Sequence, residues 1–122
     1  MDLALKFSVV KEMSTAEAQN IFGEFLRKEE SILRAYTHTR DKVVFTDRQL
    51  ICYDVQGITG SKKEFRFFPY SKITSFSVET AGTFDGDADF KIWMSGVGMF
   101  EIKFAKSLDV KKIGIFLAKT IG

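Results

Sequence analysis

The stretch SILRAYTHTRDKVVFTDRQLICYD (residues 31–54) decides the fold class, because its side chains alternate with a period of two. The alternation is clearest from Ile32 to His38, and it is typical of a strand whose successive side chains point to opposite faces of a sheet. Turn-forming residues interrupt it at Arg40-Asp41 and at Thr46–Gln49. The stretch therefore predicts three consecutive β-strands joined by tight turns.

The period of two continues beyond this stretch. Four further strands are predicted at residues 63–68, 73–79, 90–94 and 100–104, separated by glycine-containing loops or by Pro69. The period then becomes helical, with an apolar stripe running from Val110 to Ile121 and Ser107 as the predicted N-cap. The order is thus seven strands followed by one amphipathic helix.

An N-terminal extension, residues 1–30, precedes the strands. Ser14 to Glu17 has the pattern of a capping box, and the apolar spacing after it predicts a helix over residues 15–27. Before the helix, alternation from Leu3 to Val9 predicts a short strand or an extended arm, with a helix as the alternative. Residues 31–122 are then expected to form one domain, since a chain of this length supports a single core.

Four short segments resemble the bacterial pleckstrin-homology-like domain family: FTDRQLI (45–51), PYSKITSF (69–76), VETAGTFD (78–85) and KIW (91–93). The resemblance covers about residues 30–121. It implies a mainly β fold, a seven-stranded bent antiparallel barrel capped by a C-terminal α-helix, to which the N-terminal helix is an addition. It also implies a non-enzymatic protein-interaction module that forms a symmetric ring-like homo-oligomer.

Composition narrows the classes of function. The net charge of +2 lacks the basic excess of nucleic-acid binders, so no nucleic-acid partner is expected. The single Cys52 excludes an internal disulfide and a cysteine metal cage, and no cofactor is predicted. With no signal segment and no apolar run near ~18 residues, a cytoplasmic location is expected. Residues 1–30 carry a net −2 and the remainder +4, a split that would help one part of the protein dock on another copy.

Phenylalanine is unusually abundant, with 13 in 122 residues. Either all of them lie in the core, or some reach the surface and form an interface. Two strands place large apolar residues next to each other, as in Ile92-Trp93, although neighbours in a strand face opposite sides. We therefore predict a homo-oligomer, with an unknown protein partner as the alternative, and these candidate interface residues: Trp93, Phe68, Tyr70, Ile21, Phe22 and Phe25.

Two groups of cations suggest a second function, the binding of an anionic ligand such as a phospholipid headgroup at a membrane surface. Clustered phosphates need several cations close together. The candidates are Arg34, Arg40, Lys42, Lys62, Lys63 and Arg66. The first hairpin is short and contains Asp41, unlike the lipid-binding pattern, and Glu64 interrupts the second group. Ordinary solvated charges are therefore the alternative.

Catalysis is not predicted, because no acid, base and nucleophile stand in a recognisable arrangement. His38 is the only histidine, and Cys52 lies within an apolar strand where thiols are usually inert. Asp85 to Asp89 begins like a calcium loop, but the sixth and twelfth positions are Phe90 and Gly96 instead of Gly and Glu. Neither an enzyme nor a metal site is expected.

Overall fold

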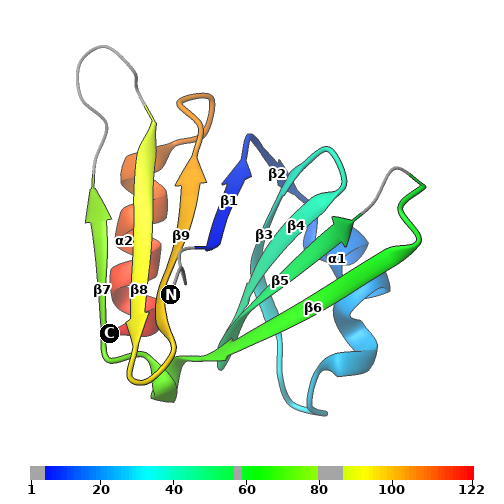
Figure 1. Ribbon diagram of the computed structural model, residues 1–122, viewed down its shortest axis with the longest axis horizontal. Helices are drawn as coiled ribbons and strands as arrows, with labels where there is room; N and C mark the ends of the chain where they lie inside the picture. Colours follow the sequence, from blue (N-terminus) through cyan, green and yellow to red (C-terminus); the bar gives the residue numbers. More distant parts are fainter. Residues whose placement is uncertain (1–4, 57–58, 80–86) are drawn as a thin grey trace. The chain divides into compact units, whose positions relative to one another are not determined.

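The computed structural model describes residues 5–56, 59–79 and 87–122 (Figure 1). The chain divides into two compact units, residues 11–69 and residues 1–10 with 70–122. The described residues of each unit form one β-sheet and one α-helix. The predicted features at Leu3, in the loop at Gly57 and Ile58, and at Asp85 and Gly86 lie outside the described residues.

The unit of residues 11–69 holds a five-stranded antiparallel sheet in the order β2-β3-β4-β5-β6. Its strands are β2 (Lys11–Met13), β3 (Ile32–His38), β4 (Asp41–Thr46), β5 (Gln49–Gln56) and β6 (Lys62–Pro69). The four strands predicted between residues 31 and 68 are confirmed. The first turn lies at Thr39-Arg40 and not at Arg40-Asp41, with Thr39 at a φ of 54° and Asp41 already in β4.

Helix α1 (Thr15–Phe22) packs against this sheet through Ala18 and Phe22, which are both fully buried. The predicted N-cap Ser14 is confirmed, since the Glu17 N–H donates to the Ser14 hydroxyl over 3.1 Å, and that hydroxyl lies 3.5 Å from the Glu17 carboxylate. The α-helix is shorter than predicted: it gives way to a 3₁₀ turn, η1 (Gly23–Phe25). Glycine is a poor helix former, which explains the change of geometry at Gly23.

The second unit holds a four-stranded sheet in the order β1-β9-β8-β7. Its strands are β1 (Leu5–Val9), β7 (Ser75–Glu79), β8 (Ala88–Met94) and β9 (Gly98–Phe104), and β1 runs parallel to β9. The strand predicted from Ile73 begins only at Ser75, because a 3₁₀ turn, η2 (Tyr70–Lys72), precedes it. The Ile73 N–H donates back to the Tyr70 carbonyl and thereby closes that turn.

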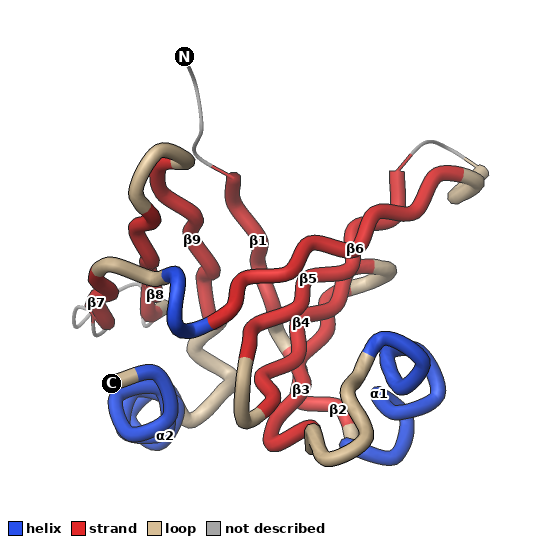
Figure 2. The backbone as a smooth tube through the Cα atoms, turned by 90° about the horizontal axis from the view of Figure 1, so that it is seen from below, coloured by secondary structure: helices blue, strands red, loops and turns tan. Residues whose placement is uncertain are grey.

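Helix α2 (Val110–Ile121) packs on the four-stranded sheet of its own unit (Figure 2). It buries Ile113 and Leu117. Its N-cap is Asp109, whose carboxylate accepts from the Lys112 N–H over 3.1 Å. The prediction of Ser107 as N-cap was wrong. The Ser107 hydroxyl instead donates to the Val10 carbonyl over 2.8 Å, which joins β1 to the start of the helix.

The mainly β fold class with one helix after the strands and one before them is confirmed, with one difference in architecture. The described residues form two hydrogen-bonded sheets, one of five strands and one of four, whereas a single seven-stranded bent barrel was expected. The two additional strands, β1 and β2, come from the N-terminal extension. Among the described residues, no helix is long and apolar enough to cross a membrane.

Candidate functional site

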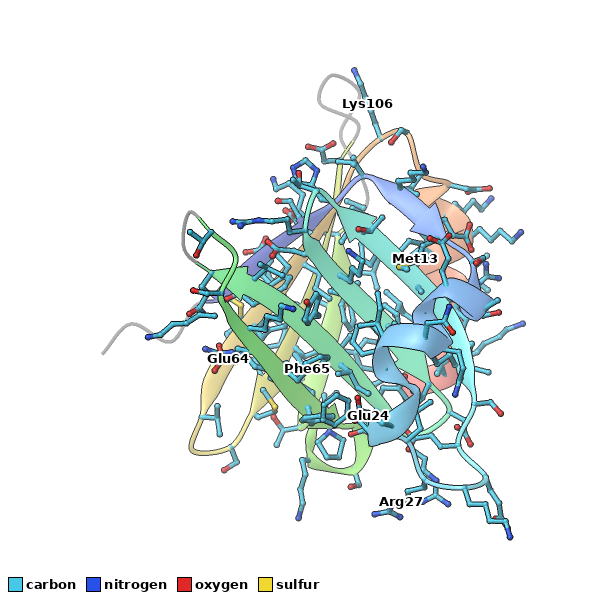
Figure 3. The ribbon with its side chains drawn as sticks, turned by 90° about the vertical axis from the view of Figure 1, so that its right-hand side faces the viewer. Met13, Glu24, Arg27, Glu64, Phe65 and Lys106 are labelled. Carbon is cyan, nitrogen blue, oxygen red and sulfur yellow. The ribbon has the colours of Figure 1, made fainter. Side chains whose placement is uncertain are left out.

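Exposed aromatic side chains gather where η1 meets β6. The Phe25 ring centroid lies 4.4 Å from that of Phe65 and 5.6 Å from that of Phe67. Phe25 and Phe67 each remain 41% exposed. Figure 3 shows Phe65 on β6 beside the end of the helical segment that carries Glu24. We call Phe25, Phe65 and Phe67 the aromatic surface.

The sheet register explains why these rings meet. Phe65 lies opposite Tyr53 and Phe67 opposite Ile51, so both side chains leave the face of β6 on which α1 packs. Phe22 fills the core beneath them, with its ring centroid 5.8 Å from that of Phe65 and edge-on to it. The aromatic surface is thus the exposed margin of a packed core.

The predicted interface residues are distributed between core and surface. Phe22 and Phe68 are buried, and Ile21 is half-buried against the core cluster of α1. Tyr70 lies half-buried in η2. Of these six residues, Phe25 and Trp93 keep the largest exposed fractions, at 41% and 37%.

Trp93 belongs to the face of the four-stranded sheet opposite its apolar face. Its neighbours across the sheet are Ser75 and Met99, whereas Ile92 lies opposite Phe76 and Phe100 on the other face. Farther along Trp93's face, Asp89 forms an ion pair with Lys103 over 3.6 Å. The indole is therefore an apolar patch beside a charged surface.

The pleat of the five-stranded sheet separates the predicted anion-binding residues into two classes. Arg34 and Arg66 lie on the face opposite α1, and each forms an ion pair, with Glu12 over 3.4 Å and with Glu64 over 3.1 Å. Their charges are balanced within the unit. Each of the two sequence clusters is therefore divided between the two faces of the sheet.

On the face that carries α1, the charged side chains of the described strands beyond the helix are all cations. Lys11 lies opposite Thr37, Lys42 opposite Tyr53, and Lys63 opposite Val55. The Lys42 ammonium stands 5.9 Å from the Tyr53 ring centroid. We call Lys11, Lys42 and Lys63 the lysine face. Lys62 is exposed at the start of β6, and the Arg40 guanidinium lies close to Gly60, in the β5–β6 connection.

A buried carboxylate locks the β4–β5 turn to the segment that follows α1. Glu30 is 7% exposed, and its carboxylate accepts from the Thr46 hydroxyl at 2.6 Å, the Gln49 amide at 3.0 Å and the Arg27 N–H at 3.1 Å. Burial alone would raise the pKa of Glu30, but these hydrogen bonds outweigh it and lower the pKa below its ordinary 4.5. The carboxylate is therefore a structural anion.

The buried reactive groups are held in their protonated forms. Burial raises the pKa of the Cys52 thiol well above its ordinary value and that of the Tyr36 hydroxyl to about 12. Neither group is an activated nucleophile at neutral pH. No group of three or more metal-ligating side chains occurs among the described residues.

Sequence reasoning missed three contributors to these sites. Phe68 was predicted as an interface residue and Phe67 was not, whereas Phe68 is 7% exposed and Phe67 41%. Lys11 lies in β2, which was not predicted. The sequence therefore did not indicate that Lys11 and Lys42 lie on either side of Thr37, on one face of the sheet. Glu30 stands next to Glu29 in an acidic pair, and only the fold distinguishes the buried one.

The chain resembles known proteins along nearly its whole length. The family profile described as "Bacterial PH domain" matches residues 4–121. Two relatives come from Bacillus subtilis (strain 168). The uncharacterised protein YjqA is 50% identical over 69% of this chain and 67% of its own length. The uncharacterised protein YozO is 35% identical over 74% of this chain and 77% of its own length.

Among solved structures, a pleckstrin-homology-domain protein of the DUF1696 family from Shewanella loihica PV-4 is 38% identical, with a TM-score of 0.82 over 92% of this chain and 97% of its own. A pleckstrin homology domain from Shewanella amazonensis SB2B is 35% identical, with a TM-score of 0.73 over 92% and 91%. The profile match spans both units and both sheets. The chain belongs to the bacterial PH domain family.

Proposed function

We propose that this protein is a non-enzymatic assembly module of the cytoplasm that forms a symmetric, ring-like homo-oligomer. The observation that carries the proposal is the aromatic surface. Exposed aromatic rings clustered on one patch are the composition of an interface core. The exposed parts of the Phe25 and Phe67 rings are apolar, and contact with a second copy would remove them from water.

The strand beneath this surface supports pairing with another chain. β6 is the last strand in the order of the described sheet, so one side of its backbone faces no strand of that sheet. Pro69 lies opposite Gln49 and has no N–H to donate, so these two residues form a non-hydrogen-bonded pair. The backbone carbonyl of Pro69 therefore points away from β5. By alternation, Phe65 and Phe67 also direct their backbone groups away from β5. The same residues then offer aromatic rings and backbone hydrogen bonds.

Loss of the aromatic surface should dissociate the oligomer. We expect the double variant Phe25→Ser/Phe67→Ser to elute as a single subunit of 13.9 kDa, because it removes the exposed rings and leaves buried Phe22 intact. Light scattering coupled to size-exclusion chromatography measures the mass directly. The matched control is Leu33→Ser/Val97→Ser, two exposed apolar residues outside the surface, 42% and 56% exposed. Equal dissociation of both double variants would contradict the assignment.

The lysine face favours a second candidate function, the binding of an anionic membrane surface. Cations without acids on one face of a sheet create a positive potential, which attracts anionic lipid headgroups. Lys42 and Lys63 project from that face, whereas Arg34 and Arg66 are paired on the other. Electrostatic attraction of this kind weakens as salt is added.

For this candidate we expect Lys42→Glu/Lys63→Glu to weaken binding to phosphatidylcholine vesicles containing phosphatidylserine. Each lysine near such a surface contributes about 1 kcal/mol, so the loss should be at least about thirtyfold. Co-sedimentation at low and high salt is the measurement. Lys72→Glu/Lys106→Glu changes the charge equally at exposed sites outside the lysine face and is the control. Absence of wild-type binding at low salt would exclude this function.

A further inference from the structure

The outward side of α2 is basic. Lys112, Ile115 and Lys119 follow the spacing i, i+3, i+7, so they share one side of the helix, and all three are exposed. They lie opposite the side that buries Ile113 and Leu117. Ile115 is 49% exposed between the two lysines. We call these three residues the basic ridge.

The outward side of α1 has the same spacing with the opposite charge. Glu17, Asn20 and Glu24 also follow i, i+3, i+7, all three are exposed, and Glu24 lies on the η1 turn that continues the helix. They lie opposite the side that buries Ala18 and Phe22. Between residues 14 and 26, Glu17 and Glu24 are the only charged residues. We call Glu17, Asn20 and Glu24 the acidic ridge.

The two ridges complement each other in charge and spacing. On each ridge the charged residues are seven positions apart, which is about 10 Å along a helix. We propose that the basic ridge of one copy docks on the acidic ridge of the next, with Lys112 and Lys119 facing Glu17 and Glu24. Opposite charges at an interface fix its register and exclude other pairings.

This inference rests on the proposed assembly and identifies the two surfaces that meet. A contact between different surfaces of identical chains is heterologous, and repetition of such a contact generates a ring when its rotation closes. The aromatic surface borders the acidic ridge, because Phe25 directly follows Glu24. Docking would therefore cover the exposed Ile115 opposite Asn20, with the aromatic surface next to the Glu24 end of the contact.

Charge exchange tests the pairing. Glu17→Lys/Glu24→Lys places four lysines at the contact, and Lys112→Glu/Lys119→Glu places four glutamates there. Each double variant should require at least about a tenfold higher concentration for half-assembly, because like charges then meet. The quadruple variant carrying all four substitutions restores opposite charges and should assemble at the wild-type concentration. Lys72→Glu/Lys106→Glu is the control for net charge, and far-UV circular dichroism reports folding.

The outcomes separate this inference from the proposed function. Wild-type oligomers with both double variants assembling normally would overturn the ridge contact and leave the assembly proposal standing. Dissociated double variants without restoration in the quadruple variant would overturn the pairing of these two ridges. A monomeric wild-type protein would overturn the assembly proposal and this inference together.

Discussion

Replacing Phe22 by alanine should destabilise the protein by about 3–5 kcal/mol, which is the usual cost of removing a buried aromatic ring. Phe22 is 0% exposed, and it packs in one cluster with Met13, Ala35 and Ile51. Its ring also lies edge-on to Tyr53 at a centroid distance of 6.2 Å. The substitution leaves a cavity between α1 and the sheet.

Urea unfolding followed by far-UV circular dichroism, at one fixed protein concentration, measures this loss. The control is Leu33→Ala, on β3 of the same unit, because Leu33 is 42% exposed. Surface substitutions of that kind usually change stability by less than about 0.5 kcal/mol. A loss for Phe22→Ala as small as for Leu33→Ala would mean that α1 is not part of the folded core.

Replacing Glu30 by glutamine should destabilise the protein by about 2 kcal/mol at neutral pH, because hydrogen bonds to a charged group contribute roughly 1.5–3 kcal/mol. The glutamine amide N–H groups would face donors from Thr46, Gln49 and Arg27 that need an acceptor. The exposed neighbour Glu29 offers the control Glu29→Gln, which should have almost no effect.

The pH dependence of this difference identifies its cause. The native pKa of Glu30 lies below the ordinary 4.5, so its carboxylate adds stability at pH values above the unfolded-state pKa. That stability is lost as the pH falls through the native pKa. The gap in unfolding free energy between wild type and Glu30→Gln should therefore shrink on acidification. A gap that stays constant down to pH values well below 4 would show that the charge is not responsible.

Much of the fold could be predicted because its signals are local. Strict alternation places β3 to β6 within one or two residues of their observed bounds, and the capping box starts α1 correctly. β1 lies within the short strand predicted from Leu3 to Val9, whereas β2 was not predicted, because it has three residues and gains its strand geometry from pairing with β3. The N-cap of α2 depends on which of two nearby polar side chains reaches Lys112, and that is settled by Ser107 bonding Val10.

The candidate site was less predictable, because it depends on which strands become neighbours. Phe67 and Phe68 are the same residue type, so the sequence does not distinguish their environments. Phe67 lies on the α1 face because the strand register places it opposite Ile51. The basic residues group differently from their sequence clusters for the same reason. Lys11 and Lys42 are far apart in sequence but lie on one face, whereas Arg66, three residues from Lys63, lies on the other.

The central claim is assembly, and the mass of the wild-type protein in solution tests it most directly. Light scattering coupled to size-exclusion chromatography should give a mass of several subunits of 13.9 kDa, maintained on dilution through the micromolar range. That result would agree with burial of the aromatic surface between copies. A mass of 13.9 kDa at tens of micromolar would contradict the account.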